Sequence, residues 1–495
     1  MTPNGPNLSR PNASGQRMCA TMTYTLPLLL VGGILLTALS ASAAEEPLRL
    51  HPDNPHYFLF RGQPTVIITS AEHYGSVLNL DFDYAKYLET LQRDGMNCTR
   101  LFVGPYCESS TSFNIVRNTL APAPGRFACA WARSDQPGYA NGGNKFDLSR
   151  WDEAYFARLK DFMAKASASG VIVEVNLFCP FYGDGQWALS PFNAANNVNG
   201  LGNVPRTDVF TLDKHGGLLA IQKQMVRKMV AELQGFDNLY YEIMNEPYIR
   251  QVPLDWEHHI ATVIADAESS LPRRHLISQN IANGKAEVRS PDANVSILNF
   301  HYAWPPDTVG LNYALNRVIG DNETGFKGTA DFHYRREAWA FLLSGGGLYN
   351  NLDYSFTLGH EDGTFVLPPK QPGGGGPSLR AQLRILSGFL RALDFLKTAP
   401  RPTVVQGKLA DGLSAFVLAE TGRQYGVYLC RNEPLAEAAP ADVVLDLPAG
   451  SYQLTWVNTL TGATAGEQQL RHDGGVVKLS APPFAEDVAL RAVAR

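Results

Sequence analysis

The sequence predicts an α/β protein, a (β/α)8 (TIM) barrel followed by a small C-terminal antiparallel β-sandwich. Three observations lead to this prediction. From about Leu48 to Thr398, short apolar runs alternate with amphipathic helical stretches, which is the pattern of βαβ units around a parallel sheet. Eight strand candidates occur there, which fits a closed barrel better than an open sheet. After Thr398 the helical period ends, and short alternating runs separated by Gly, Pro and Asn follow.

Each expected strand is a short apolar run, and each expected helix carries apolar residues at helical spacing, such as Tyr84, Tyr87, Leu88 and Leu91. No G-x-G-x-x-G follows the first strand, which argues against a dinucleotide-binding fold. In order, the expected strands are Thr65–Thr69, Cys98–Val103, Val171–Phe178, Leu239–Met244, Leu276–Ser278, Val295–Phe300, Arg317–Gly320 and Gly347–Leu352. The expected helices are Phe82–Asp94, Asp152–Ala168, Leu218–Leu233, Trp256–Ser269, Tyr334–Leu343 and Ser378–Leu396.

Two long connections, residues 104–150 and 180–215, follow the second and third strands. In a barrel both would lie at the C-terminal face, where long loops are usually functional. The glycine run in Pro372–Pro377 is expected to be a flexible surface loop. These features predict a barrel over residues 45–398 and a β-sandwich over residues 399–495.

The sandwich prediction depends on five short alternating runs, and its role is open between sugar binding and simple packing against the barrel. The runs are Ala415–Leu418, Tyr425–Cys430, Asp442–Leu445, Tyr452–Val457 and Gly475–Leu479.

Composition excludes several classes of protein. Of 495 residues, 45% are hydrophobic and 18% are charged, which excludes a disordered chain. The net charge of −5 leaves no basic excess for binding nucleic acid or an anionic membrane surface.

The N-terminus indicates export. Arg10 and Arg17 precede an apolar run from about Tyr24 to Leu39, and Ala41-Ser42-Ala43-Ala44 follows. This order predicts a signal peptide over residues 1–44 and a secreted product, extracellular or periplasmic, that leaves the membrane after cleavage. A membrane anchor is the alternative, but the run is shorter than the ~20 residues that a span needs.

The cysteines leave two interpretations open. Five cysteines follow the expected signal, and none forms a C-x-x-C pair, so a disulfide scaffold or structural zinc site is poorly supported. One bridge between Cys107 and Cys129 is one interpretation, and buried or free thiols are the other.

The strongest chemical signal is Asn245-Glu246-Pro247 at the end of the apolar run Leu239–Met244. Proline cannot continue the strand ladder, so the strand ends there and Glu246 is presented at the rim of the barrel. Because apolar residues flank Glu246, we expect its pKa to be raised, as a general acid requires. A helix N-cap is the alternative interpretation of this motif.

A second carboxylate is expected at the end of another strand. Glu323 follows the apolar run Arg317–Gly320 and lies 77 residues after Glu246, about three βα units further along a barrel. Asp321 is the nearest rival, and Glu337 and Glu361 are remoter ones. A glycosylation sequon at Asn322-Glu323-Thr324 is a further interpretation of this segment.

In these residues the chain resembles the retaining (β/α)8 glycoside hydrolases of the clan that includes the family 5 cellulases and mannanases. The resemblance spans about residues 48–398. It implies that Glu246 is the acid/base and that Glu323 is the nucleophile. Arg100 resembles the clan's arginine that hydrogen-bonds the nucleophile, and His301-Tyr302 resembles its substrate-contacting pair.

Three further segments extend the comparison with this clan. Phe146–Trp151 looks like the segment that opens the helix before the third strand in these enzymes. The tail, with Trp456–Thr459 and Thr461-Gly462, looks like the small β-domain of secreted bacterial members. Tyr349–Leu352 departs from the pattern, because the clan often places a tryptophan on strand 8.

The resemblance implies a secreted retaining glycoside hydrolase that cleaves β-glycosidic bonds of poly- or oligosaccharides by double displacement. No metal or organic cofactor is expected, since two carboxylates suffice and neither H-E-x-x-H nor G-x-S-x-G occurs. Two alternatives stay open, a non-catalytic carbohydrate-binding protein and a transglycosidase. The expected substrate-binding residues are Asn245, Arg100, His301, Tyr302, His73, Trp304 and Trp187, the tryptophans by stacking on a sugar. A structural role is the alternative for both tryptophans and for His73.

Overall fold

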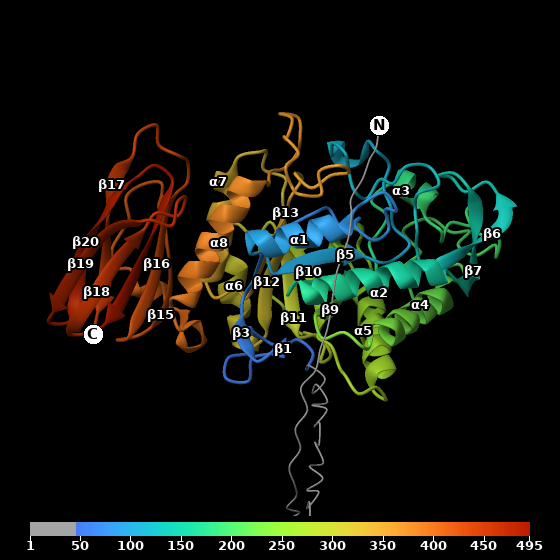
Figure 1. Ribbon diagram of the computed structural model, residues 1–495. Helices are drawn as coiled ribbons and strands as arrows, with labels where there is room; N and C mark the ends of the chain where they lie inside the picture. Colours follow the sequence, from blue (N-terminus) through green and yellow to red (C-terminus); the bar gives the residue numbers. More distant parts are fainter. Residues whose placement is uncertain (1–45) are drawn as a thin grey trace, which may run out of the picture. The chain divides into compact units, whose positions relative to one another are not determined.

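The protein contains a closed barrel of eight parallel strands (Figure 1). The computed structural model describes residues 46–495, so the predicted signal peptide lies outside the described residues. Neighbouring strands pair in parallel in the order β4-β13-β12-β11-β10-β9-β8-β5, and Thr69 Oγ1 of β4 donates to Cys98 O of β5 at 2.6 Å. The (β/α)8 barrel prediction is confirmed. The strands are β4 (Ile67–Ala71), β5 (Cys98–Phe102), β8 (Ile172–Asn176), β9 (Leu239–Glu242), β10 (Ile277–Asn283), β11 (Ile297–His301), β12 (Val318–Thr324) and β13 (Leu348–Leu352).

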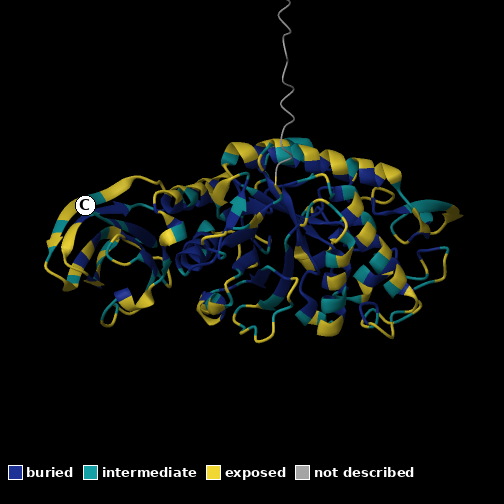
Figure 2. Cartoon of the chain, turned by 90° about the horizontal axis from the view of Figure 1, so that it is seen from below, coloured by how far each residue is buried: buried dark blue, intermediate teal, exposed yellow. Residues whose placement is uncertain are grey.

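Helices surround these strands, and most of them bury one apolar face against the barrel. In Figure 2 the central strands are dark blue, and exposed yellow residues alternate with buried ones along the surrounding helices. Local sequence sets the ends of α1: the Asp83 carboxylate accepts from two backbone N–H groups, and Gly95 ends the helix at a φ of 77°. The helices are α1 (Tyr84–Asp94), α2 (Glu153–Ala168), α3 (Asp184–Leu189), α4 (Leu218–Leu233), α5 (Leu254–Glu268), α6 (Asp307–Asn312), α7 (Asp331–Leu343) and α8 (Pro377–Arg391). Five 3₁₀ turns complete the described helical elements: η1 (Ser112–Asn114), η2 (Pro247–Arg250), η3 (Tyr313–Leu315), η4 (Phe395–Lys397) and η5 (Pro402–Val404).

Several elements were not predicted. A small antiparallel sheet of β1 (Arg49–Leu50), β2 (Phe58–Phe60) and β3 (Gln63–Thr65) precedes the barrel. The first long loop carries a hairpin of β6 (Trp131–Pro137) and β7 (Asn144–Trp151). The segment expected to open a helix is therefore part of strand β7, and α2 begins only after its N-cap, Asp152.

The glycine run before α8 is not the surface loop that the sequence suggested, because most of it is buried. A Cβ atom on Gly373 would lie 1.6 Å from the carbonyl oxygen of Gly325, and one on Gly375 would lie 2.2 Å from Asp353 Oδ1. The glycines are needed for close backbone packing here.

The C-terminal β-domain consists of two antiparallel sheets, which confirms the predicted architecture. The larger has the order β14-β15-β16-β21-β18-β19, and the smaller pairs β17 with β20. β19 and β21 were not predicted; β19 is largely exposed and polar, so it carries little apolar alternation. The strands are β14 (Ala399–Pro400), β15 (Leu413–Glu420), β16 (Gln424–Arg431), β17 (Ala439–Leu447), β18 (Gly450–Val457), β19 (Thr464–His472), β20 (Gly475–Phe484) and β21 (Asp487–Ala494).

Helix α7 of the barrel packs against the β-domain through both charged and aromatic contacts. The Arg335 guanidinium donates to Asp487 at 2.8–3.2 Å and also pairs with Glu486. Beside it, the Trp339 ring stacks on Tyr428 with the centroids 5.3 Å apart. The Arg335–Asp487 pair is almost completely buried, so each charge depends on the other.

Replacing Arg335 with alanine should lower the free energy of unfolding by about 3–5 kcal/mol, because it leaves the buried Asp487 carboxylate unpaired. Urea unfolding followed by circular dichroism measures this change. Arg126→Ala is the control, since its pair with Asp81 is exposed and should contribute no more than about 1 kcal/mol. Equal losses for the two variants would contradict the role assigned to the buried pair.

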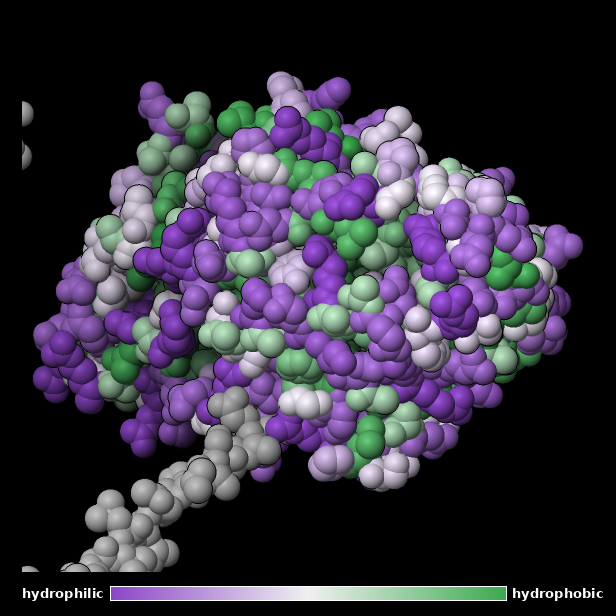
Figure 3. Space-filling view, turned by 45° about the vertical axis from the view of Figure 1, so that its right-hand side comes forward, coloured by the Kyte–Doolittle hydropathy of each residue, from purple (hydrophilic) through white to green (hydrophobic). Residues whose placement is uncertain are grey.

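Two of the remaining predictions concern the thiols and the membrane, and Figure 3 shows one face of the surface. All five described cysteines are free and buried, so Cys107 and Cys129 form no bridge. Within residues 46–495, no helix has the length and apolar composition of a membrane span. On the face drawn in Figure 3, hydrophilic residues predominate and hydrophobic residues are interspersed among them.

Candidate active site

A pocket of about 450 Å³ lies where the parallel strands end at their carboxyl sides. Its walls come from residues that follow β4, β5, β8, β9, β11 and β12, so segments far apart in the sequence meet there. Among the lining residues are His73, Tyr74, Glu108, Tyr182, Asn245, Glu246, Tyr302 and Glu323.

Glu246 follows β9 and is held by a bent backbone. Its φ of 40° is unusual for a residue other than glycine, and its N–H donates to Asn280 Oδ1 at 2.9 Å. Pro247 then begins the turn η2. The Glu246 carboxylate accepts from the Tyr182 hydroxyl at 2.6 Å and lies 3.2 Å from His301 Nδ1. The backbone therefore turns this carboxylate into the pocket, where it has two polar partners.

Glu323 lies near the end of β12 and is surrounded by hydrogen-bond donors. One carboxylate oxygen accepts from the Tyr74 hydroxyl at 2.7 Å and from Arg100 Nη1 at 3.0 Å. The other accepts from the Tyr302 hydroxyl at 2.7 Å. Three donors, one of them cationic, hold this carboxylate in one orientation and stabilise its negative charge.

The two carboxyl groups face each other across His301. One oxygen of Glu246, one oxygen of Glu323 and a ring nitrogen of His301 all lie within 4.8 Å of one another. Such a trio could also ligate a cation. However, tyrosine and arginine donors already occupy lone pairs on both carboxylates, which favours a metal-free acid pair.

The prediction of a raised pKa for Glu246 is wrong for the free protein. Burial does raise the pKa of this carboxyl, but the hydrogen bond and charge of His301 and the Tyr182 hydroxyl outweigh it. The pKa of Glu246 consequently lies below its ordinary value. The sequence-based prediction took account of the apolar neighbours in the strand. It did not include the hydrogen-bond donors His301, from β11, and Tyr182, from the loop after β8.

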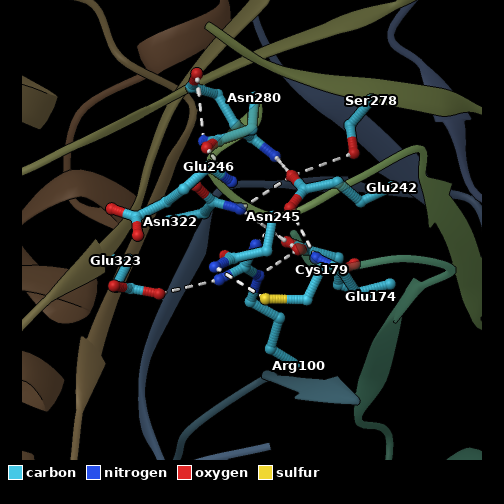
Figure 4. A network of polar contacts seen from close by, with 12 residues as sticks. Arg100, Glu174, Cys179, Glu242, Asn245, Glu246, Ser278, Asn280, Asn322 and Glu323 are labelled. Atoms are coloured by element: carbon cyan, nitrogen blue, oxygen red, sulfur yellow. Dashed lines mark hydrogen bonds and ion pairs between the residues drawn. The ribbon is translucent and has the colours of Figure 1, made fainter. Parts of the chain in front are cut away.

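Beneath the pocket, Arg100 is buried among three carboxylates. It pairs with Glu174 and Glu242 inside the barrel and with Glu323 above them. Figure 4 shows the Glu246 and Glu323 carboxyl groups side by side, on the side of the network away from Glu174 and Glu242. Burial raises the pKa of Glu242 to about 7, against the opposing effect of Arg100. The network restrains the guanidinium that contacts Glu323.

The structure divides the expected substrate-binding residues into three groups. Asn245, Tyr302 and His73 line the pocket. Arg100 and His301 are buried below it and contact the carboxylates rather than the open space.

The two tryptophans do not line the pocket, so their predicted stacking on a sugar is corrected. Trp187 lies on α3 and packs against the Phe181 ring at 4.9 Å. Trp304 lies beside the β-domain: its ring is 6.0 Å from that of Phe416, and the Arg336 guanidinium is 4.2 Å from its centroid. Both positions follow strand ends, but the chain turns these rings into packing contacts.

Sequence reasoning did not foresee that two tyrosines contact the carboxylates. Tyr74 stands beside His73 after the first strand of the barrel, and Tyr182 lies in the loop after the third. Position after a strand end is the only signal that pointed to either of them.

The rival carboxylates lie elsewhere. The β11–β12 register pairs Phe300 with Asp321 and His301 with Glu323, so an irregularity separates the two acids of β12. Asp321 is buried next to Glu337 of α7, and neither residue lines the pocket. Glu361 accepts from the N–H of Gly359 at 3.0 Å in the loop after β13.

Replacing Glu337 with glutamine should stabilise the protein at high pH. Burial raises the pKa of Glu337 from 4.5 to about 8, so the folded state keeps a proton that the unfolded chain releases. The free energy of unfolding therefore falls as pH rises from about 4.5 to 8. Glu337→Gln removes this loss and should gain up to about 4 kcal/mol at pH 8 but little at pH 4.5, measured by urea unfolding. An equal change at both pH values would contradict this titration.

Comparisons with known proteins support the fold. No protein-family model matches the sequence, and no curated protein is significantly similar to it. A candidate glycoside hydrolase from Bacteroides vulgatus superposes with a TM-score of 0.65 at 13% identity, covering 91% of this chain and 83% of that chain. A family 5 glycoside hydrolase from the same organism superposes with a TM-score of 0.58 at 12% identity, covering 90% and 93%. At the level of fold, these structures confirm the resemblance seen in the sequence: the chain shares the (β/α)8 architecture of these glycoside hydrolases.

Proposed function

We propose that this protein is a secreted retaining glycoside hydrolase that cleaves β-glycosidic bonds of poly- or oligosaccharides. The observation that carries the proposal is the approach of Glu246 and Glu323 at the ends of the fourth and seventh barrel strands, with carboxylate oxygens within 4.8 Å. Retaining pairs lie about 5–5.5 Å apart, whereas inverting pairs need roughly 6.5–9.5 Å for an intervening water. The fold shared with glycoside hydrolase structures supports the class of substrate.

In the first step, a Glu323 oxygen attacks the anomeric carbon while Glu246 gives a proton to the glycosidic oxygen, whose bond to that carbon breaks. This step leaves a glycosyl ester on Glu323. In the second step, Glu246 removes a proton from water, the water oxygen attacks the anomeric carbon, and Glu323 leaves as a carboxylate. The product keeps the anomeric configuration of the substrate.

The surrounding residues position these groups. Tyr74, Tyr302 and Arg100 hold Glu323 for attack. Asn245 lines the pocket and its Oδ1 is buried without a partner, so this residue is the candidate to hydrogen-bond the sugar 2-hydroxyl. A bound sugar excludes water from Glu246, which disfavours its charged form and shifts its pKa toward that of a general acid.

The test combines a substrate panel with stereochemistry. The protein is incubated with aryl β-glycosides and with β-linked poly- and oligosaccharides, and proton NMR follows the first sugar released. We expect the β-anomer to appear first and to mutarotate later. Initial release of the α-anomer would contradict the retaining mechanism. Binding without release across the panel would favour a non-catalytic carbohydrate-binding protein, and longer products in the presence of acceptor would favour a transglycosidase.

Export is part of the proposal and rests on residues 1–44 of the sequence. Expression of the full chain in a secretion-competent bacterium should release a mature protein outside the cytoplasm. N-terminal sequencing should find its first residue near Glu45. An uncleaved product that stays with the membrane would indicate the anchor instead.

A further inference from the structure

The charged residues that line the pocket differ in how far they are buried. The three acids, Glu108, Glu246 and Glu323, are buried, and each is only 3–8% exposed. The two basic residues are more accessible, since Arg250 is half-buried and Lys327 is exposed. No acid occurs among the exposed and half-buried residues that line this pocket in the described part of the chain. The accessible part of the lining therefore carries only positive charge.

Each cation of this basic pair, Arg250 and Lys327, comes from a segment that follows one of the two acids. Arg250 lies four residues after Glu246, and Lys327 lies four residues after Glu323. Both line the same pocket as the proposed acid/base and nucleophile. Because the protein as a whole has a net charge of −5, the basic pair is not part of a generally basic surface.

The position of Arg250 is fixed by its neighbours. Its Nη2 donates to the carbonyl of Tyr182, the tyrosine whose hydroxyl donates to Glu246. The turn η2, which carries Arg250, is tied to the end of β10 because the Tyr248 hydroxyl donates to Asn283 Oδ1 at 2.7 Å. Nε and Nη1 of Arg250 have no acceptor among residues 46–495. Two nitrogens of this guanidinium are thus without an acceptor from the protein.

The backbone at Lys327 is also held in place. Its N–H donates to the Tyr334 hydroxyl at 3.0 Å, and that hydroxyl donates to the Gly328 carbonyl at 2.6 Å. No described acid lies within ion-pair distance of the Lys327 ammonium group. Lys327 does lower the pKa of Glu337, but burial outweighs this effect and keeps that pKa at about 8. Glu337 is therefore mostly uncharged at pH 7 and does not neutralise Lys327.

Cations without a protein counter-ion are suited to binding anions. Charge-assisted hydrogen bonds from guanidinium or ammonium groups to carboxylate or sulfate oxygens are about twice as strong as bonds between neutral groups. A neutral sugar would leave both charges of the basic pair without a counter-ion. A carboxylate or sulfate on the sugar would supply one.

We propose that Arg250 and Lys327 bind an anionic group of the substrate, so that the glycan cleaved in this pocket carries carboxylates or sulfate esters. This inference rests on the proposed function, because it names the class of substrate for the same pocket. The basic pair determines specificity and takes no part in bond breaking.

The first test compares matched substrates. β-Linked oligosaccharides that carry uronic acids or sulfate esters are added to the panel, each with a neutral counterpart made by carboxyl reduction or desulfation. We expect kcat/KM to be at least about 10-fold higher for an anionic member than for its counterpart, the scale of one charge-assisted hydrogen bond. The two kinds of anion show whether a carboxylate or a sulfate is recognised. Hydrolysis of every neutral counterpart at an equal or higher kcat/KM would overturn this inference and leave glycoside hydrolysis intact.

The second test removes the two charges. The double variant Arg250→Gln/Lys327→Gln should lose the preference for the anionic substrate, measured as the ratio of the two kcat/KM values. Arg250→Lys/Lys327→Arg keeps both charges and should retain most of this preference. Lys214→Gln is the control, since Lys214 is exposed in the loop after β8 and does not line the pocket. A purely structural effect would lower both kcat/KM values by the same factor, and an unchanged ratio in the double glutamine variant would reject the role of the basic pair.

Ionic strength gives an independent measurement. The Debye length falls from about 30 Å at 0.01 M to about 3 Å at 1 M salt, so contacts with an accessible cation are screened. The preference for the anionic substrate should therefore decrease as sodium chloride is added. A preference that is independent of salt would contradict recognition by accessible cations.

A binding measurement separates this inference from the proposed function. If no member of the panel is hydrolysed, the proposed function fails. Calorimetric titration of the same anionic and neutral oligosaccharides into the full protein then tests the basic pair directly. A Kd at least about 10-fold lower for an anionic member, with the difference lost in the double glutamine variant, supports the inference. No preference for any anionic member rejects it.

Discussion

Replacing Glu323 with alanine should lower kcat by about 10⁴-fold or more, because the substrate then has no nucleophile with which to form the glycosyl ester. The three residues that donate to Glu323, Arg100, Tyr74 and Tyr302, carry no carboxylate that could replace it. Steady-state kinetics with the best aryl glycoside measure the effect. Azide should partly restore turnover and form the glycosyl azide of opposite anomeric configuration, since it attacks from the vacated side.

Asp321→Asn is the matched control for this variant. Asp321 belongs to the same strand but is buried beside Glu337, outside the pocket. It should retain kcat within about tenfold, since it contacts neither carboxylate of the pair. If Asp321→Asn abolished turnover while Glu323→Ala preserved it, the nucleophile would have to be reassigned to Asp321.

Replacing Glu246 with alanine should slow glycosides with poor leaving groups far more than those with good ones. A general acid contributes about 10²–10⁴-fold where the departing oxygen needs a proton, and little for a nitrophenolate. The second step also loses its base, so the glycosyl ester should accumulate with good leaving groups. A series of aryl glycosides of graded leaving-group pKa measures the first effect, and rapid mixing should show a burst for the second.

Azide and pH complete the test of Glu246. Azide needs no general base, so it should raise turnover of Glu246→Ala and give the β-glycosyl azide. In the wild type, ionisation of Glu246 in the substrate complex should produce the alkaline fall of kcat, which the variant should lack. Tyr182→Phe removes one donor to the Glu246 carboxylate and should shift this fall to higher pH. An unchanged alkaline limb in Glu246→Ala would contradict its role as the acid.

Local patterns in the sequence were sufficient for the barrel. All eight expected strands coincide with β4, β5 and β8–β13 to within a few residues, because the apolar runs that must fill a barrel are also the runs that periodicity detects. The same reasoning predicted that Glu246 and Glu323 lie at strand ends. A proline follows Glu246 at the end of its apolar run, and acidic residues follow the run before Glu323.

Local sequence patterns did not predict the structure of segments whose conformation depends on packing against distant parts of the chain. The hairpin of β6 and β7 lay hidden in a loop rich in glycine and polar residues, and the glycine run before α8 was interpreted as a surface loop. Trp304 followed a strand end, yet its ring packs beside Phe416 of the β-domain. Such contacts depend on which distant segment arrives at a given place, and that information is not local.

The sequence by itself determined which strands form the barrel, their order around it and the two strands that carry the acids, since these follow from hydrophobic period and strand-ending residues. Only the tertiary structure decided the chemistry of the pair. An irregularity in the β11–β12 register places Glu323, and not Asp321, at the pocket. His301 and Tyr182 come from other parts of the chain and lower the pKa of Glu246, which its strand neighbours alone would have raised. A pKa depends on every charge and donor within a few ångströms, and those neighbours are defined only when the barrel closes.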